Sequence, residues 1–240
     1  MYPPLNVLKP VAAGIWVVDS GPLRLLGMSL PIRMTVVKLK SGRIWLHSPT
    51  DITAGIRTEI DQLGPVAHIV APNTAHWTRV KAWAEAYPDA VTWAVPHLPA
   101  RAQVRRSGTR FARELGDAPE AEWSGEIDQA LVPGGFNYRE ALFHHRASGT
   151  LILTDLVVNM EAGKLSAFGR MAARLTGTLA PHGKTPIYMR QVLRMRGSEA
   201  RAAVSRMLAL SPRRAIFSHG DWYREDATPR LREALGWLLG

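Results

Sequence analysis

Two histidines and an aspartate stand just after hydrophobic runs that read as buried strands. In α/β proteins, functional side chains gather at the carboxyl ends of sheet strands, because the rigid sheet holds them in place. Imidazole and carboxylate groups bind divalent metal ions, so the pattern predicts either a metal site or the remains of one. The residues are His76, in the turn after 66–71, Asp155, after 150–154, and His219, after 215–218.

Hydrophobic patterning predicts the elements that must position these residues: hairpin strands come first and strand–helix units follow. Strands 33–39 and 43–47 form the expected hairpin, and a buried strand at 66–71 precedes a helix at 76–87. A largely helical region covers 165–210, with an interruption around 181–186. Further strands are expected at 14–19, 91–95, 127–132, 141–145, 150–154 and 215–218, and further helices at 53–63 and 228–239.

The composition is that of an ordinary globular protein, with 46% hydrophobic and 21% charged residues in 240, and we expect one α/β domain over residues 1–240. There is no cysteine, which excludes thiolate catalysis and leaves His, Asp and Glu as the strong metal ligands. No stretch approaches the roughly 20 apolar residues of a membrane helix, and the N-terminus lacks the pattern of a signal peptide. We therefore expect a cytoplasmic location.

Positive charge is concentrated in one segment. The net charge is +10, and seven basic residues but no acid occur between Gly163 and Ser198. Such a segment attracts phosphate, carboxylate or an anionic bilayer, although charge runs are also typical of a solvated face. The sequence thus predicts a small anionic substrate or ligand, held by Arg170, Arg174, Arg190 and Arg194.

Part of this segment also has the pattern of a membrane-surface helix. Residues 165–175 have an apolar face with arginines at its edge, a pattern shared by interfacial helices and by helices that cover a core or pocket. Peripheral membrane contact is therefore a second interpretation. The eight tryptophans are dispersed rather than interleaved with basic residues, so the sequence does not favour a nucleic-acid partner.

The order of elements and four short phrases resemble the metallo-β-lactamase fold superfamily, and more narrowly a bacterial branch with no assigned function. The resemblance implies a four-layer αβ/βα sandwich with mixed sheets and a metal site at the strand ends. It spans roughly residues 14–220. The phrases are Leu46-His47-Ser48-Pro49, Val70-Ala71-Pro72-Asn73, Tyr87-Pro88-Asp89-Ala90 and Ser218-His219-Gly220.

Carried over by position, the resemblance implies that most family ligands are replaced. His76, Asp155 and His219 match ligands of one metal position, while the histidines of the other are lost and one family aspartate is also missing. This implies no dinuclear site, and at most one divalent ion such as zinc, iron or manganese. The replaced positions are Ala71, Asn73 and Gly135 for the histidines and Ala75 for the aspartate.

Neighbouring residues extend the predicted site. His47 and Asp221 flank the same sheet end and could supply a fourth ligand or orient the others, and the Asn73 amide lies close by in sequence. Asp155 and Asp221 are the candidate catalytic carboxylates. Each of these residues also has a purely structural interpretation, as a buried polar group satisfied by hydrogen bonds.

Two functions remain open. The first is a mononuclear metal-dependent hydrolase acting on an anionic small-molecule ester or phosphoester. The alternative is a metal-free pseudoenzyme that binds a ligand or partner on the same fold. No Walker A sequence, dinucleotide-binding glycine motif or nucleophile elbow competes with these interpretations.

Overall fold

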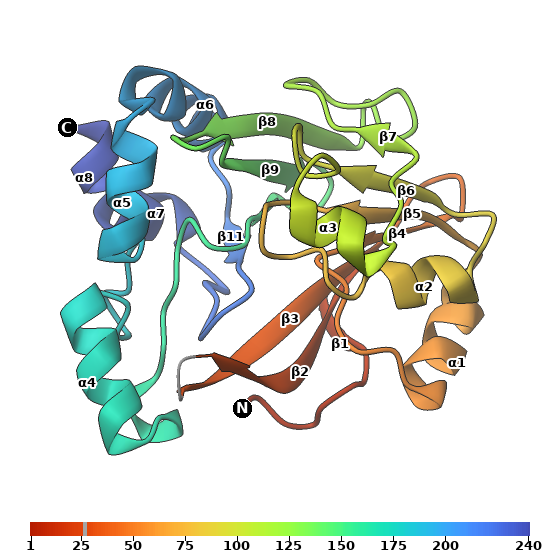
Figure 1. Cartoon of the computed structure of the whole chain (residues 1–240), viewed down its shortest axis with the longest axis horizontal. Coiled ribbons are helices and arrows are strands. Elements are labelled where there is room, and N and C mark those ends of the chain that lie inside the picture. Colours follow the sequence, from red (N-terminus) through yellow and green to blue (C-terminus); the bar gives the residue numbers. More distant parts are fainter. Residues whose placement is uncertain (26–27) are drawn as a thin grey trace.

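The computed structural model describes residues 1–25 and 28–240, and its centre is a pair of facing β-sheets (Figure 1). The first sheet has seven strands in sequence order. Its first four strands pair antiparallel, and β4 to β7 run parallel. The strands are β1 (Lys9–Ala12), β2 (Ile15–Leu25), β3 (Met28–Lys38), β4 (Ile44–His47), β5 (Val66–Ala71), β6 (Val91–Ala94) and β7 (Arg113–Glu114).

The second sheet has four strands in the order β11-β10-β9-β8. Strands β8, β9 and β10 pair antiparallel, whereas β11 lies parallel to β10. The carboxyl ends of β10 and β11 therefore meet at one edge, which brings Asp155 and His219 together. The strands are β8 (Ile127–Pro133), β9 (Arg139–His145), β10 (Thr150–Ile152) and β11 (Arg214–Ile216).

Helices cover the outer faces of both sheets. On the first sheet α2 packs on β5, and on the second α6 packs on β8 and β9 while α7 packs on β11. The result is the four-layer αβ/βα sandwich that the sequence predicts (Figure 1). The helices are α1 (Ala54–Leu63), α2 (Val80–Ala86), α3 (Ala102–Ser107), α4 (Ala167–Thr176), α5 (Ile187–Arg194), α6 (Gly197–Ala209), α7 (Ala227–Ala234) and α8 (Gly236–Leu239), with a short 3₁₀ turn, η1, at Ala162–Lys164.

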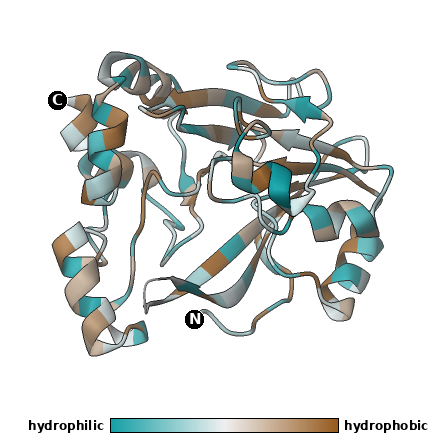
Figure 2. Cartoon of the chain, in the orientation of Figure 1, coloured by the Kyte–Doolittle hydropathy of each residue, from teal (hydrophilic) through white to brown (hydrophobic). Residues whose placement is uncertain are grey.

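Large aromatic side chains fill the space between the sheets. Trp45 lies edge-on to Trp123 and to Phe143, with ring centroids 6.1 and 4.9 Å apart, and Trp93 packs edge-on to Trp123 at 4.9 Å. Hydrophobic residues recur along the strands of both sheets, while the helices carry hydrophobic and hydrophilic residues together (Figure 2). This core gives the strand ends a rigid base.

The sequence predicted most elements correctly, and the differences have local causes. The strand at 66–71 and the hairpin are confirmed. The helix expected from His76 begins only at Val80, because Asn73 accepts hydrogen bonds from two backbone N–H groups and holds a turn there. Within the described residues, no helix is both long and apolar enough to cross a membrane.

Candidate metal centre

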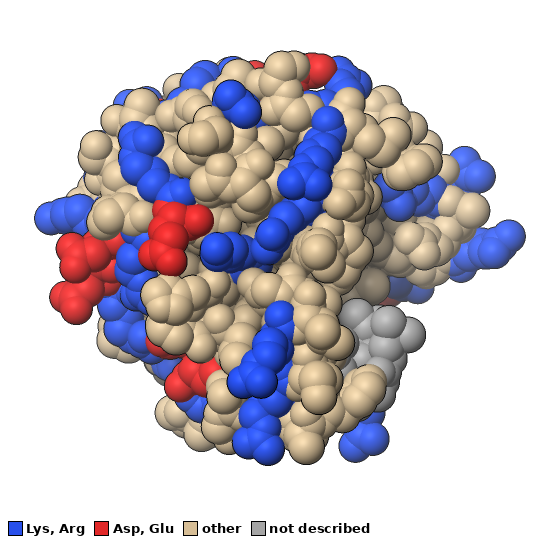
Figure 3. All heavy atoms as spheres, turned by 90° about the vertical axis from the view of Figure 1, so that its left-hand side faces the viewer, with Lys and Arg blue, Asp and Glu red and all other residues tan. Residues whose placement is uncertain are grey.

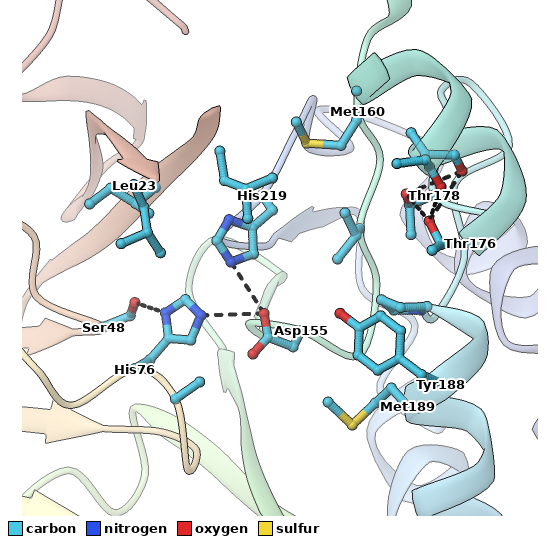
Figure 4. Close-up of a pocket in the computed structure, with 18 of the residues that line it drawn as sticks. Leu23, Ser48, His76, Asp155, Met160, Thr176, Thr178, Tyr188, Met189 and His219 are labelled. Carbon is cyan, nitrogen blue, oxygen red and sulfur yellow. Dashed lines mark hydrogen bonds and ion pairs between the residues drawn. The ribbon is translucent and has the colours of Figure 1, made fainter. Parts of the chain in front are cut away.

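Three side chains from three strand ends meet at one point (Figure 4). The Nε2 atoms of His76 and His219 each lie 3.3 Å from Oδ1 of Asp155. All three donor atoms lie within 4.8 Å of one another. The sequence placed these residues at separate strand ends, and the two sheets bring them into one cluster.

The ring of His219 is held with Nε2 facing the cluster. Its Nδ1 lies 2.7 Å from the carbonyl oxygen of Pro31. A carbonyl only accepts, so Nδ1 carries the hydrogen and the neutral ring keeps its lone pair on Nε2.

The loop that carries His219 is fixed by a buried arginine. Arg33 donates to the carbonyls of Phe217 and Gly220 at 2.7 and 2.9 Å. Gly220 has φ 98°, and a Cβ there would lie 2.1 Å from the Asn159 carbonyl oxygen, so the close approach of the two loops requires glycine. The sequence analysis did not identify Arg33. A charged residue beginning an otherwise hydrophobic stretch was the available signal.

His76 is oriented by a hydroxyl group. Its Nδ1 lies 2.7 Å from Oγ of Ser48, and its backbone N–H donates to Oδ1 of Asn73 at 2.9 Å. The ring is thereby held with Nε2 toward Asp155. Ligand histidines in metal sites usually have such a partner on the other ring nitrogen.

The Asp155 carboxylate is fixed through its second oxygen. Nδ2 of Asn73 donates to Oδ2 of Asp155 at 2.7 Å and to Oγ1 of Thr154 at 2.9 Å. Oδ1 is therefore the oxygen that faces the two histidines. Asn73 is fully buried and uses both ends of its amide. The structure thus places Asn73 where the sequence expected a residue that orients the others.

Glu140 holds the loop that carries Asp155, and the sequence analysis did not identify it. Its carboxylate accepts from the backbone N–H groups of Thr154, Asp155 and Leu156, and from the hydroxyl of Tyr138. The side chain is fully buried. A carboxylate just before the strand expected at 141–145 was the only sequence signal.

The charges of the cluster influence one another. Burial opposes the charged form of His76, but the charge and hydrogen bond of Asp155 outweigh it and raise the pKa of His76. Burial alone would raise the pKa of Asp155, yet the two histidines hold it well below its usual range. Burial raises the pKa of Glu140, and the nearby Asp155 charge adds to this effect, while its hydrogen-bond donors oppose it. Positive charge beside Asp155 is therefore stabilised.

The cluster lies at the polar end of a pocket of about 340 Å³. The size is at the lower end of the range for small-molecule sites. Among the described residues, Tyr188 from α5 lies across from Asp155, with its hydroxyl toward the cluster (Figure 4). The remaining wall is mostly apolar, and its aliphatic members include Leu23, Leu30, Ile32, Val158, Met160 and Leu165.

The other predicted site residues lie apart from the cluster. His47 is buried, stacked on Trp45, and its Nε2 has no hydrogen-bond partner within the described part of the chain. The Asp221 carboxylate pairs with Arg224 at 2.7 Å, and Asp221 is absent from the described residues that line the pocket. The expectation of a catalytic Asp221 therefore finds no support in the geometry.

The four arginines predicted to bind an anion do not line the pocket among the described residues. Arg190 and Arg194 lie over the ring of Trp237. Arg170 and Arg174 are exposed on α4. The one arginine in the lining is Arg79, and its Nε is already paired with Asp51 at 2.8 Å.

The positions of the lost ligands are closed by protein atoms. Asn73 is engaged as described, and Ala71 is fully buried in the sheet. At Gly135 a Cβ would lie 2.2 Å from the sulfur of Met195, an exposed side chain that would have to move aside for a larger residue. We call Ala71, Asn73 and Gly135 the sealed half of the site, and His76, Asp155 and His219 the open half.

The open half fits a single divalent cation. With Nδ1–H of His219 donated to Pro31, the lone pair on its Nε2 faces a carboxylate oxygen. Nε2 of His76 faces the same oxygen. The His219 lone pair and the carboxylate oxygen are both acceptors, so a proton or a metal ion must lie between them, and two imidazoles with one carboxylate form a known zinc ligand set.

Solved structures with the same fold include metallo-β-lactamases and a flavodiiron core. The metallo-β-lactamase from Pontibacter korlensis is 12% identical, with a TM-score of 0.63 over 96% of this chain and 97% of that chain. The mono-zinc form of FIM-1 from Pseudomonas aeruginosa is 14% identical, with a TM-score of 0.61 over 98% and 96%. The Flv1 flavodiiron core from Synechocystis sp. PCC6803 is 13% identical, with a TM-score of 0.62 over 96% of this chain and 60% of that one.

At these identities the likeness establishes the fold, which is that of the metallo-β-lactamases. No curated protein matches the sequence. The family described as Domain of unknown function (DUF4336) matches residues 13–201, well over half of the chain. The protein therefore belongs to the DUF4336 family, and its fold is that of the metallo-β-lactamases.

Proposed function

We propose that the protein is a mononuclear metal-dependent hydrolase. The observation that carries the proposal is the convergence of Nε2 of His76, Nε2 of His219 and Oδ1 of Asp155 at the polar end of a pocket. These three atoms would hold the ion. A divalent ion held by three protein ligands supplies an activated water and polarises a substrate carbonyl.

The chain's own residues would orient the ligands and the substrate. Ser48 and the Pro31 carbonyl hold the outer nitrogens of the two histidines, which keeps both Nε2 atoms facing Asp155. Tyr188 lies across the pocket, where partial burial and the negative charge of Asp155 raise its pKa. Its phenol therefore stays protonated at neutral pH and can donate a hydrogen bond to a substrate oxygen.

The pocket favours an ester with an apolar acyl part. Its wall is largely aliphatic, and the arginines expected to recruit an anion lie elsewhere. Burying an unpaired phosphate against such a wall would be costly. We therefore narrow the anionic ester or phosphoester expected from the sequence to a carboxylic ester or thioester, with its carbonyl at the cluster.

A metal-free pseudoenzyme is the second candidate, and one observation favours it. Asp155 raises the pKa of His76, so a protonated His76 would satisfy the same carboxylate without any ion. In that case the pocket binds a ligand and performs no chemistry. The two candidates differ in metal content, which makes that measurement decisive.

Elemental analysis of protein purified without chelator tests the metal. We expect about one equivalent of a divalent transition metal per chain, as a three-ligand site holds. His76→Ala and His219→Ala should each lose it, whereas His182→Ala, at an exposed histidine paired with Glu233, should keep it. Less than about a tenth of an equivalent, in protein that also fails to take up added zinc, would support the pseudoenzyme instead.

Hydrolysis of a chromogenic ester tests the chemistry separately. We expect p-nitrophenyl butyrate to be cleaved by metal-loaded protein more efficiently than p-nitrophenyl phosphate, and neither by protein treated with chelator. Tyr188→Phe should lower kcat while metal content is unchanged, because the phenol is proposed to contact substrate and not the ion. Cleavage that persists in metal-free protein would contradict the proposed role of the cluster.

A further inference from the structure

Helix α4 carries an apolar stripe that faces outward. Phe168, Met171 and Leu175 are 62%, 59% and 71% exposed. Their spacing of three and four residues places them on one side of the helix. A group of large apolar side chains that are this exposed marks a surface that contacts a membrane or another protein.

Basic side chains border the stripe. Arg170 and Arg174 are exposed one turn apart beside it, and no acidic residue occurs between residues 162 and 198. Figure 3 shows the face of the molecule that carries α4 and α5, with Lys and Arg distributed among uncharged atoms and acidic atoms gathered mainly toward one side. The apolar stripe therefore lies in a region of positive potential.

The opposite side of the same helix faces the pocket. Gly169, Ala172 and Thr176 line the cavity that ends at the metal cluster. These small residues let α4 pack closely, with Ala173 in an apolar cluster that also contains Val158 and Met160. α4 thus separates the pocket from whatever the outer stripe contacts.

We propose that α4 docks this protein on the surface of an anionic bilayer. Phe168, Met171 and Leu175 enter the boundary between headgroups and acyl chains, and Arg170 and Arg174 contact lipid phosphates, as in other amphipathic interfacial helices. A second copy of this chain is a poor occupant, because it would bring a like-charged face against this one. The docked helix sets the apolar pocket beside the membrane, although docking itself does not depend on a metal or on hydrolysis.

Vesicle flotation tests the proposal. We expect the protein to float with phosphatidylcholine vesicles that contain about 30% phosphatidylglycerol, and to remain unbound with phosphatidylcholine alone. About 0.5 M salt should release most of it, because screening weakens the arginine contacts. The same result is expected in protein treated with chelator.

Two pairs of variants distinguish membrane binding through α4 from binding through the net charge or through exposed apolar residues elsewhere on the protein. Each basic side chain near a membrane contributes about five-fold, so Arg170→Glu with Arg174→Glu should weaken binding at least about 25-fold. Arg105→Glu with Arg106→Glu makes the same net-charge change on exposed residues of α3 and should have a much smaller effect. Phe168→Ser with Leu175→Ser should abolish flotation, whereas Leu210→Ser, also at an exposed apolar residue, should not.

Three results would overturn the proposal. The first is no binding to anionic vesicles by the unaltered protein. The second is an equal loss of vesicle binding in the α4 and α3 charge variants, which would show that the net charge attracts the protein nonspecifically. The third is a dimer in solution that Phe168→Ser with Leu175→Ser dissociates, since this would make the stripe a protein interface. Circular dichroism of each variant verifies that the fold is retained.

Discussion

The open and sealed halves of the site both lie at the ends of strands but differ in what completes their hydrogen bonding. In the sealed half, the Asn73 amide has a partner for each end, and the Met195 side chain fills the space at Gly135. In the open half, the lone pair on Nε2 of His219 faces Oδ1 of Asp155, and Nε2 of His76 lies at the same distance from that oxygen. The sealed half is complete as protein alone, whereas the open half is completed either by a proton on His76 or by a cation.

Under the proposed function, this difference is how a site for which the resemblance implies two metal positions would hold only one ion. Replacing a ligand with a group that hydrogen-bonds within the protein removes the need for an ion, because each buried polar atom then has a partner. Asn73 does this and at the same time fixes Oδ2 of Asp155. The sealed half therefore orients a ligand of the open half, and the two halves can be tested separately.

The largest effect should come from Glu140, which holds the loop that carries Asp155 of the open half. Glu140→Ala removes the acceptor for three buried backbone N–H groups, each costing about 1–3 kcal/mol, so we expect a loss of at least about 3 kcal/mol in the free energy of unfolding. Urea denaturation of metal-free protein measures it. Glu140→Gln retains an acceptor oxygen and should cost less, and Glu114→Ala, at an exposed residue, should be nearly neutral. A cost below about 1 kcal/mol for Glu140→Ala would show that the loop does not depend on this carboxylate.

A smaller effect, visible only in acid, should come from His47. Burial, followed by the nearby positive charge of His76, lowers the pKa of His47 to about 3. In the unfolded chain the imidazole has its ordinary pKa of about 6.5, so between pH 6.5 and pH 3 the unfolded state binds more protons than the folded state. The contribution of His47 to stability is therefore complete above pH 6.5 and is lost as the pH falls. For one such group the free energy of unfolding falls by about 1.4 kcal/mol for each pH unit below 6.5.

His47→Phe should remove this slope while keeping the contacts with Trp45 and Phe143. Urea denaturation at several pH values between 7.5 and 4.5, with chelator present, gives the comparison. The variant should gain about 2–3 kcal/mol relative to the unaltered protein by pH 4.5. His182→Gln changes an exposed histidine and should leave the slope unchanged. A parallel pH dependence in His47→Phe would mean that His47 is protonated in the folded state.

The sequence predicted the fold and the open half because both have local signals. Hydrophobic runs that end in a polar residue located His76, Asp155 and His219, and the resemblance showed which ligands were missing. The supporting contacts have no such signal. Glu140 is close to Asp155 only because β9 lies beside β10, and Arg33 reaches Gly220 across 187 residues of chain. The geometry does not support a catalytic Asp221, because adjacency to His219 does not determine which side of a turn a side chain takes, and its carboxylate pairs with Arg224.

The smallest effect, on metal affinity, should come from Ser48, whose hydroxyl contacts the outer ring nitrogen of His76. Ser48→Ala removes the partner of Nδ1 of His76 but leaves all three donor atoms in place. Loss of such a supporting group typically weakens metal affinity by 10- to 100-fold, and we expect about 10-fold because Ser48, although buried, lines the pocket, where a water molecule can replace its hydroxyl. Competition with a chromogenic chelator measures the zinc dissociation constant. Ser218→Ala, whose hydroxyl lies 3.5 Å from that of Ser48, removes a similar group without touching a ligand and should change affinity little. If Ser48→Ala binds zinc as tightly as the unaltered protein, the orientation of His76 depends on its backbone turn at Asn73 rather than on the hydroxyl.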